Sequence, residues 1–269
     1  MKLSEAIKKL SEAGIDSARH DAREVFMHFG GFTLGDLISG DAACDSPELA
    51  YAIERRAARY PLQYIIGKTW FYREEYFVSE ECLIPRPDTE ILVDYAVKHI
   101  RRGAVFADLC TGSGCVGISV LKNTEGTRAL LVDISDGALA VAARNAAHNG
   151  VAERAEIRRM DVMAEVPDEK FFAVLSNPPY VSDSAYRELE AEIYHEPRLA
   201  FVGGDDGADF YRSLTPIYKE KIEKDGFIAY EIGYDQGEIL IEIARECGMR
   251  CEIIKDIGGG NDRVAILRL

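Results

Sequence analysis

The sequence predicts an α/β protein in which a small helical bundle is joined by a β-hairpin to a doubly wound, mostly parallel sheet with an antiparallel edge strand. Before about residue 60, the apolar residues recur at helical spacing. After about residue 103, short apolar runs alternate with helical segments, which is typical of a parallel sheet covered by helices. Between the two parts, the alternating and aromatic-rich run WFYREEYFV predicts the hairpin.

The N-terminal helical domain is predicted over residues 1–67, followed by a hairpin linker over 68–85. The run LSEAIKKL has apolar residues at i, i+3, i+4 and i+7, with Ser4 placed to cap the helix. A later helix is predicted to begin after Ser46 as its N-cap, with Pro47 in the first helical position, and to end before the next proline. This domain is therefore expected to consist of several short, packed helices.

The remaining residues, 86–269, are predicted to form the sheet domain. The runs AVFADL, RALLVD, AEIRRMD and FFAVLSN are typical of strands, and the segments CVGISVLKN and DGALAVAARNAAHNG between the first pairs have helical period. The final two runs, RCEIIKD and RVAILRL, lie too close in sequence for a helical crossover, so an antiparallel hairpin at the sheet edge is expected. The glycine-rich stretch IGGGNDR between them predicts a loop.

Composition and charge exclude several classes of function. The net charge of −14 is unlike that of a protein that works by coating nucleic acid, because such affinity comes from Lys and Arg on phosphates. The six cysteines form no CxxC pair, so we predict reduced thiols and no metal site. No apolar stretch is long enough to span a bilayer, and the first residues carry charges where a signal peptide would be apolar. We therefore expect a cytoplasmic protein without membrane association. Nothing in the sequence requires more than a monomer.

Chemistry is expected at the carboxyl ends of the strands, where ligands bind in sheets of this kind. In the loop after the first strand, Gly112, Gly114 and Gly117 form a GxGxxG match, which is typical of NAD-binding folds. However, Asp108 precedes this loop and would face the pyrophosphate of a dinucleotide. S-adenosylmethionine fits both features, because it has an adenosine, no phosphates and an ammonium group that Asp108 could bind directly or through water.

Two further carboxylates follow the next strands. Asp133 ends the second strand, where it could accept hydrogen bonds from both ribose hydroxyls. Asp161 follows the third strand, where it could reach the adenine amino group, with Val162 against the ring. Taken singly, each Asp is better explained as a helix N-cap or a turn residue. Three carboxylates at consecutive strand ends favour a nucleoside site.

The sequence SNPPYVSD follows the fourth strand. The carbonyl oxygens of Asn177 and Pro178 could accept both hydrogens of one planar NH2 group, on which Tyr180 could stack. The prolines, Pro178 and Pro179, remove backbone donors and stiffen the loop. Such a clamp would align a poorly nucleophilic nitrogen with the sulfonium methyl, so that no strong general base is needed. The alternative is a proline turn that merely ends the strand, and beside an S-adenosylmethionine site the clamp is favoured.

The sequence NPPY after a DLCTGSG loop resembles the amino-methyltransferases, which act on nucleic-acid bases or on glutamine amides. The segments PLQYIIGKTWFYREEYFVSEECLIPRPDTEILVD and HEPRLAFVGGDDGADFYR resemble the protein-(glutamine-N5) methyltransferases that modify peptide chain release factors, and this similarity runs nearly end to end. The resemblance implies a class I methyltransferase fold and a substrate-recognition role for residues 1–67. It also implies the Gln of the release factor's Gly-Gly-Gln loop as substrate and S-adenosylhomocysteine as product.

The resemblance also assigns roles to residues. The NPPY residues match the family's substrate motif, and Asp133 matches its ribose carboxylate. The residues that match the cofactor turn are Cys110, Thr111, Gly112, Ser113 and Gly114. Most of IPRPDTE is explained as the start of a helix, and HEPRLAFVGG could line the substrate mouth. Arg86 and Glu196 in these two segments are the further substrate-binding candidates.

Two positions depart from the family pattern. Cys110 stands where the family often has Gly, so a positive backbone φ is not expected there. Val162 stands where some relatives have an aromatic residue, which predicts weaker packing on the adenine.

Three other functions remain open from the sequence. An amino-methyltransferase that flips out a DNA or RNA base would use the same four residues, but the net acidity and the lack of a separate target-recognition domain disfavour it. A sister family methylates a Gln of a ribosomal protein, and only the N-terminal domain would distinguish it. A binding module without turnover is disfavoured by the intact Asp133 and Asn177.

Overall fold

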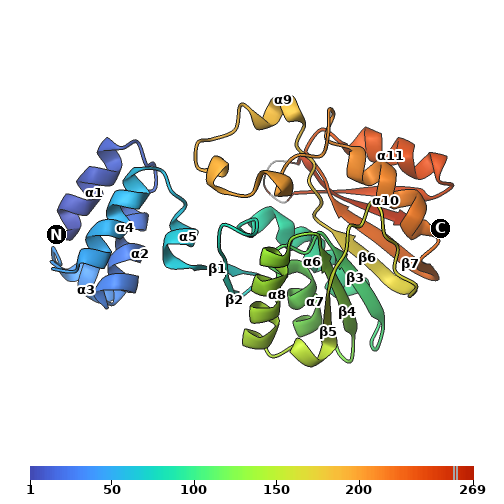
Figure 1. Cartoon of the computed structure of the whole chain (residues 1–269), viewed down its shortest axis with the longest axis horizontal. Coiled ribbons are helices and arrows are strands. Elements are labelled where there is room, and N and C mark those ends of the chain that lie inside the picture. Colours follow the sequence, from blue (N-terminus) through green and yellow to red (C-terminus); the bar gives the residue numbers. More distant parts are fainter. Residues whose placement is uncertain (257, 259) are drawn as a thin grey trace. The chain divides into compact units, whose positions relative to one another are not determined.

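The computed structural model describes residues 1–256, 258 and 260–269 of the chain (Figure 1). These residues form two compact units, which we call the helical unit and the sheet unit. The helical unit comprises Met1–Lys68 and Glu190–His195, and the sheet unit comprises Thr69–Leu189 and Glu196–Leu269. The loop predicted over IGGGNDR includes residues 257 and 259, which lie outside the described residues.

The helical unit consists of short helices around one apolar core, as the sequence predicts. Its helices are α1 (Leu3–Glu12), α2 (Ala18–Gly30), α3 (Leu34–Ser39), α4 (Pro47–Ala57) and α5 (Leu62–Ile66). The predicted cap of α4 is confirmed, since the Ser46 hydroxyl accepts a hydrogen bond from Leu49 N at 3.1 Å. The predicted cap at Ser4 is wrong: the N-cap of α1 is Lys2, two residues earlier, and Ser4 N and Oγ donate to Asp41.

A buried ion pair ties α2 to α4 within the helical unit. Arg56 and Asp21 are 4% and 3% exposed, and Arg56 Nε donates to Asp21 Oδ2 at 2.6 Å. The same guanidinium donates to the Tyr60 carbonyl oxygen and lies 3.0 Å from Glu192 Oε1. Because a buried charge is tolerated only when it is paired, this contact constrains how the two helices pack.

Replacing Asp21 by Ala should destabilise the helical unit by about 3 kcal/mol, because the Arg56 charge stays buried and loses its shortest contact. The measurement is urea unfolding of the whole protein followed by circular dichroism. Asp45→Ala, at an exposed position of the same unit, is the matched control and should change the free energy of unfolding by less than about 0.5 kcal/mol. Equal effects of the two substitutions would contradict the assignment.

The main sheet has the strand order β5-β4-β3-β6-β7-β9-β8. Its strands are β3 (Val105–Leu109), β4 (Arg128–Asp133), β5 (Ala155–Arg159), β6 (Phe171–Ser176), β7 (Ile222–Glu231), β8 (Arg250–Lys255) and β9 (Asp262–Arg268). Strands β3 to β7 pair in parallel, and β9 pairs antiparallel with both β7 and β8. The predicted antiparallel hairpin at the sheet edge is confirmed, with β9 lying between β7 and β8. The order in which successive strands are added to the sheet reverses direction between β3 and β6. In sheets of this kind, ligands bind at such a switch point.

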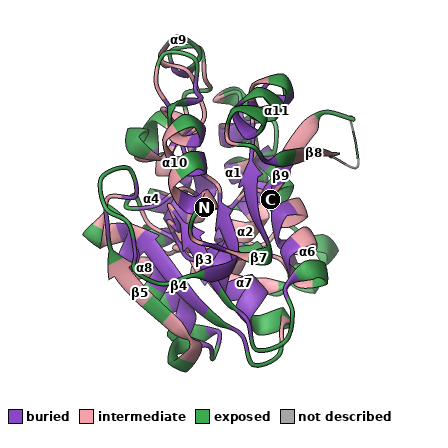
Figure 2. Ribbon diagram, turned by 90° about the vertical axis from the view of Figure 1, so that its right-hand side faces the viewer, coloured by how far each residue is buried: buried purple, intermediate pink, exposed green. Residues whose placement is uncertain are grey.

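Helices cover both faces of this sheet, so the strands are buried between them (Figure 2). Successive residues of a strand face opposite sides, and Phe106 packs with the helices of one face while Ala107 packs with those of the other. The first face carries α6 (Glu90–His99), α7 (Cys115–Asn123) and α8 (Asp136–His148), and the second carries α10 (Asp209–Lys219) and α11 (Gly237–Glu246). This three-layer arrangement leaves the carboxyl ends of the strands uncovered by these helices.

Shorter helical turns complete the chain. They are η1 (Pro87–Thr89), η2 (Ala152–Arg154), α9 (Asp183–Tyr186), η3 (Ile193–His195) and η4 (Arg198–Ala200). Within the described part of the chain, every helix is too short or too polar to cross a membrane.

The predicted β-hairpin is present, and the buried amide of Asn145 binds its last residue. Its strands are β1 (Lys68–Phe71) and β2 (Glu74–Phe77). Asn145 of α8 accepts from Phe77 N at 2.7 Å and donates to Phe77 O at 2.9 Å. The same amide nitrogen donates to Ser113 O at 2.8 Å. Asn145 therefore couples the end of the hairpin to the glycine-rich loop.

Candidate active site

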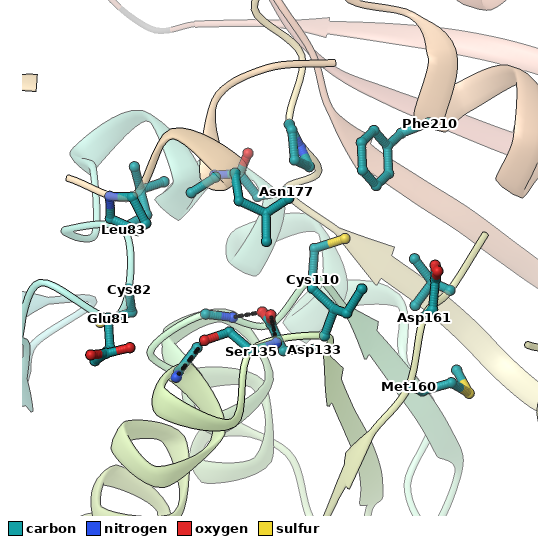
Figure 3. Close-up of a pocket in the computed structure, with 18 of the residues that line it drawn as sticks. Glu81, Cys82, Leu83, Cys110, Asp133, Ser135, Met160, Asp161, Asn177 and Phe210 are labelled. Atoms are coloured by element: carbon teal, nitrogen blue, oxygen red, sulfur yellow. Dashed lines mark hydrogen bonds between the residues drawn. The ribbon is translucent and has the colours of Figure 1, made fainter. Parts of the chain in front are cut away.

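A cavity of about 330 Å³ opens within the sheet unit at the carboxyl ends of its central strands (Figure 3). Figure 3 shows Asn177 and Phe210 on one side of the cavity, Asp133 and Ser135 on the opposite side, and Cys110 between them. These side chains come from segments far apart in the sequence. They meet because parallel strands bring their carboxyl ends to one edge of the sheet.

The loop after β3 reverses the chain through residues with positive φ. Cys110 has φ +57°, Gly112 +54° and Gly114 +81°. The prediction that Cys110 would not adopt a positive φ is therefore wrong. The chain must turn directly after the strand, because Thr111 N donates to Val132 O on β4 at 2.9 Å. A left-handed Cys costs about 1 kcal/mol, which the hydrogen bonds of the loop offset.

Close packing explains why Gly117, in the first turn of α7, is glycine. A Cβ atom at this position would lie 2.2 Å from Leu131 Cδ2 and 3.0 Å from Asp108 Oδ2. The helix can therefore approach β3 and β4 this closely only with glycine. The GxGxxG match thus reflects turn geometry and helix packing, and it does not select a dinucleotide.

Asp108 lies beneath the glycine-rich loop and is 1% exposed. Its Oδ2 accepts hydrogen bonds from Thr111 Oγ1 at 2.6 Å and from Gly117 N at 2.9 Å. Burial raises the pKa of Asp108 to about 7, although both hydrogen bonds lower it. Asp108 therefore holds the loop in place, and the predicted contact with a ligand ammonium stays a prediction.

Asp133 ends β4 and lines the cavity. Its Oδ1 accepts from Ser135 N at 3.0 Å and its Oδ2 from Gly112 N at 2.9 Å (Figure 3). Burial raises the pKa of Asp133, while these backbone hydrogen bonds lower it. A carboxylate oxygen can accept more than one hydrogen bond, so both oxygens can still receive hydroxyl groups. The geometry is compatible with the predicted ribose contact, which stays a prediction.

The end of the cavity beyond β5 is largely apolar. Met160 and Val162 are buried and line it, and Figure 3 shows Met160 and Asp161 at this end. Asp161 Oδ1 accepts from Met163 N at 3.0 Å, and its contact with an adenine amino group stays a prediction. Phe210 of α10 lines the same cavity, so an aromatic ring is available although Val162 is aliphatic.

Asn177 follows β6 and lines the cavity next to Pro179. Its Nδ2 donates to the buried hydroxyl oxygen of Thr89 at 3.2 Å. Because the amide nitrogen is used by Thr89, Oδ1 lies on the other side of the amide and is available as an acceptor. This orientation is the one that the predicted clamp requires.

The other NPPY residues are held in place by contacts with neighbouring segments of the sheet unit. Pro178 is buried, and neither Pro178 nor Tyr180 is among the described residues that line the cavity. Tyr180 Oη donates to Glu231 Oε1 at 3.1 Å. A Cβ atom at Gly203 would lie 2.4 Å from Pro179 O. The segment HEPRLAFVGG, which contains Gly203, therefore packs directly on this loop. Stacking of Tyr180 on a substrate stays a prediction.

Arg86 and Glu196 form an ion pair within the sheet unit. Glu196 is buried, and its Oε2 also accepts from Ile84 N at 2.9 Å. Arg86 borders a second cavity of about 40 Å³, which is also lined by Asp108 and Asn177. The structure thus gives Glu196 a role in holding Arg86 beside this smaller cavity, and direct substrate contact by either residue stays a prediction.

Among the described residues, the cysteines form no disulfide bond. Cys82 and Cys110 line the large cavity, and burial raises the pKa of the Cys82 thiol to about 11. Burial likewise raises the pKa of Cys110. Over the residues that the structure describes, no group of three or more His, Cys, Asp or Glu side chains is placed to hold a metal ion.

The fold and the site define the class of protein: a class I methyltransferase, as the sequence resemblance implies. The catalytic domain of hMettl16, solved in complex with MAT2A 3′UTR hairpin 6, aligns over 93% of this chain and 91% of its own, with a TM-score of 0.59 and 14% identity. A ribosomal protein L11 methylase from Lactobacillus delbrueckii subsp. bulgaricus aligns over 71% of this chain and 83% of its own, with a TM-score of 0.53 and 21% identity. At these identities the likeness shows the fold alone.

Sequence comparison places the chain in one family of this class. Residues 87–198 match the methyltransferase small domain, and residues 2–67 match the PrmC N-terminal domain. A release factor glutamine methyltransferase from Moorella thermoacetica is 35% identical over 97% of this chain and 95% of its own length. The chain therefore belongs to the release factor glutamine methyltransferases, as the resemblance predicts.

Three residues at this site are not among the residues predicted from the sequence. Thr89 lies in a predicted helix start, Phe210 has no signal of its own, and Glu231 stands outside the motifs. Glu231 carries the same signal as Asp108 and Asp133, a carboxylate at the end of an apolar strand. That signal could have identified it.

Asp108 should make stability depend on pH. The folded protein releases the Asp108 proton near pH 7, whereas an unfolded Asp releases it near 3.8. The folded state binds more protons between these values, so the contribution of Asp108 to stability falls as the pH rises from about 4 to about 7. In urea unfolding at about pH 5 and about pH 7.5, wild type should lose stability relative to Asp108→Asn, which does not titrate.

The control for this experiment is Asp168→Asn, at an exposed position of the sheet unit. Its difference from wild type should be the same at both pH values. An Asp108→Asn difference that also stays constant would show that Asp108 does not titrate in this window.

Proposed function

We propose that this chain transfers a methyl group from S-adenosylmethionine to the side-chain amide nitrogen, N5, of the Gln in the Gly-Gly-Gln loop of a peptide chain release factor, leaving S-adenosylhomocysteine. The observation that carries the proposal is that Asn177 of the NPPY motif lines the same cavity as Asp133. Family membership supports the choice of acceptor, since the relatives at about this identity are named for release factor glutamine.

The large cavity fits the nucleoside part of S-adenosylmethionine. Its volume of about 330 Å³ is at the lower end of the range for small-ligand sites. Asp133 would hold the ribose hydroxyls, and Asp161 would accept from the adenine amino group. Val162 and Phe210 would enclose the ring. When bound, S-adenosylmethionine supplies a methyl group that its sulfonium makes electrophilic.

The smaller cavity would take the amino-acid end of the same ligand. Asp108 lines it together with Thr111 and Ser113, and Cys110 and Gly112 line both cavities. Gly114 then begins the turn into α7. A bound ammonium would favour the carboxylate form of Asp108 and lower its pKa.

The NPPY loop would orient the acceptor. The oxygens Asn177 Oδ1 and Pro178 O would accept the two hydrogens of the Gln amide, with Pro179 and Tyr180 flanking its plane. In the transfer, a bond forms between N5 and the methyl carbon as the carbon–sulfur bond breaks, and N5 releases one proton to solvent. Orientation alone can contribute several kcal/mol to such a step, so a strong base is not required.

The release factor would be recognised by the helical domain, residues 1–67, with Arg86 and Glu196 contacting it near the acceptor Gln. All the residues assigned to the reaction come from one chain, so a monomer suffices. A nucleic-acid base is the alternative acceptor for an NPPY clamp. The net charge of −14 disfavours that alternative, because binding of nucleic acid depends on positive charge.

Asn177→Ala should lower kcat on a release factor by about 100-fold, because the acceptor amide loses the side-chain oxygen that orients it. The measurement is transfer of labelled methyl from S-adenosylmethionine to a purified release factor. The same factor with its loop Gln changed to Ala is the acceptor control and should take up no label. Labelling of DNA or RNA in its place would overturn the proposed substrate.

Asp133→Ala should weaken binding of S-adenosylmethionine by about 10- to 100-fold, because it removes two charged hydrogen-bond acceptors for the ribose. Isothermal titration calorimetry measures this change without an acceptor. Asp136→Ala is the matched control, since Asp136 lies three residues further on with its side chain exposed. A wild-type dissociation constant for Asp133→Ala would exclude Asp133 from the ribose site.

A further inference from the structure

Gln236 is a buried amide beside the NPPY loop that the proposed transfer does not use. It precedes α11 and is 5% exposed. Its Nε2 donates to Tyr180 O at 3.0 Å and to Gly207 O at 3.3 Å. Its Oε1 accepts from Gly233 N at 2.8 Å. One side chain therefore joins the last residue of NPPY to two other segments of the sheet unit.

The partners of Gln236 fix the orientation of its amide. Tyr180 O and Gly207 O are backbone carbonyl oxygens, which can only accept, and Gly233 N is a backbone amide, which can only donate. A flipped side chain would point its oxygen at two carbonyl oxygens and its NH2 group at an N–H group. Both hydrogens of the NH2 group are therefore used to hold the two carbonyl groups.

The prolines of NPPY make its loop dependent on donors from other segments. Pro178 and Pro179 have no backbone N–H, so neither can donate a hydrogen bond that would hold the loop. The carbonyl of the next residue, Tyr180, receives its hydrogen bond from Gln236. Because the ring of proline fixes φ, holding Tyr180 O also limits the positions that the carbonyl of Pro178 can take.

A second segment packs against the end of the NPPY loop. Val181 N donates to Phe201 O at 2.7 Å, and Gly203 N donates to Val181 O at 2.9 Å. A Cβ atom at Gly207 would lie 2.2 Å from Tyr180 O. The two segments can approach this closely only with glycine at that position.

The second carbonyl that Gln236 holds belongs to the turn into α10. Gly207 lies two residues before that helix, and Phe210 in its first turn lines the large cavity (Figure 3). Gln236 thus holds the NPPY loop in a fixed relation to one wall of the cavity in which the cofactor is proposed to bind.

We propose that Gln236 is a positioning residue of the acceptor site: by holding Tyr180 O against the turn into α10, it sets where the carbonyl of Pro178 stands relative to the cofactor. This inference rests on the proposed role of NPPY as the acceptor clamp. An acceptor amide that is aligned by two oxygens reacts more slowly when either oxygen is displaced, and a displacement of about 1 Å can cost about 100-fold in rate. A role in stability alone would leave the rate of the folded enzyme unchanged.

Two substitutions remove the donors of Gln236. Gln236→Leu has no polar group, and Gln236→Glu keeps the shape but, when ionised, points an oxygen at the two carbonyl groups. For both variants we expect kcat for methyl transfer to a release factor to fall by about 10- to 100-fold at about pH 8. Tyr234→Glu, which adds a charge at an exposed position of the same turn, is the matched control and should keep the wild-type kcat. A wild-type kcat for Gln236→Leu would overturn the proposal.

Cofactor binding separates positioning of the acceptor from damage to the fold. The dissociation constant of S-adenosylmethionine, measured by isothermal titration calorimetry, should change by less than about threefold in both Gln236 variants. The reason is that the residues proposed to bind the cofactor keep their own contacts. A loss of cofactor affinity as large as the loss of kcat would assign Gln236 to the cofactor cavity and contradict its role at the acceptor.

Protonation should partly restore Gln236→Glu. A protonated carboxyl group can donate to one of the two carbonyl oxygens, and burial raises the pKa of the introduced carboxyl. The ratio of its kcat to that of wild type should therefore rise as the pH falls from about 8 to about 6. The same ratio for Gln236→Leu should stay constant. Equal pH dependence of the two ratios would show that a donor at this position is not required.

Two titratable neighbours do not disturb this comparison. The hydroxyl of Tyr211 lies 3.3 Å from Gln236 Oε1, and burial raises the pKa of Tyr211 well above its usual value. Glu231, which accepts from the hydroxyl of Tyr180, has its pKa raised to about 7 by burial. Glu231 is present in wild type and in both variants, so its titration also appears in the ratio for Gln236→Leu.

A measurement without acceptor distinguishes this inference from the proposed function. Hydrogen exchange of the backbone amides of Val181 and Gly203, followed in 15N spectra, should be about 10-fold faster in Gln236→Leu than in wild type, because the paired segments lose the side chain that holds them. The amide of Thr111, which donates to Val132 O in the glycine-rich loop, is the internal control and should not change.

The two ideas therefore fail in different ways. Failure of the wild type to label a release factor would count against the proposed function alone. Unchanged exchange at Val181 and Gly203 in Gln236→Leu would overturn the positioning role, whatever the acceptor.

Discussion

The parallel pairing of β3 with β4 and with β6 is the constraint on which the rest of the site depends. Its register places Leu109 beside Val132 on one side and Ser176 on the other, so the three strands end together. The segments that follow them therefore share one edge of the sheet. They are the glycine-rich loop, Asp133 with the turn into α8, and the NPPY motif. All three segments contribute residues to the lining of the large cavity.

Buried carboxylates are concentrated at this edge. Burial raises the pKa of Asp108, Asp133 and Glu231, and in each case it outweighs the hydrogen bonds that the carboxylate accepts. Such groups reduce the stability of the fold at neutral pH, but each one holds a segment of the site: the loop after β3 or the residues after β6.

Local sequence patterns predicted most helices and strands. The wrong predictions concern residues whose conformation depends on a hydrogen bond to a distant segment. The helix α1 begins before the predicted cap because Leu3 N donates to Ala42 O, a partner that no local pattern indicates. Cys110 adopts a positive φ because its neighbour Thr111 is drawn to Val132 on the adjacent strand. In both cases the backbone follows a hydrogen bond to another element, which overrides the preference of the residue itself.

The sequence by itself determined the α/β class, the family, and the strand ends at which Asp133 and Asn177 stand, because periodicity and motifs are properties of contiguous residues. Only the tertiary structure decided that Asp108 holds the loop from beneath, that Phe210 reaches the cavity, and that Glu231 accepts a hydrogen bond from Tyr180 of NPPY. Burial and hydrogen-bond partners depend on which distant segments pack together, and the order of residues along one segment does not contain that information.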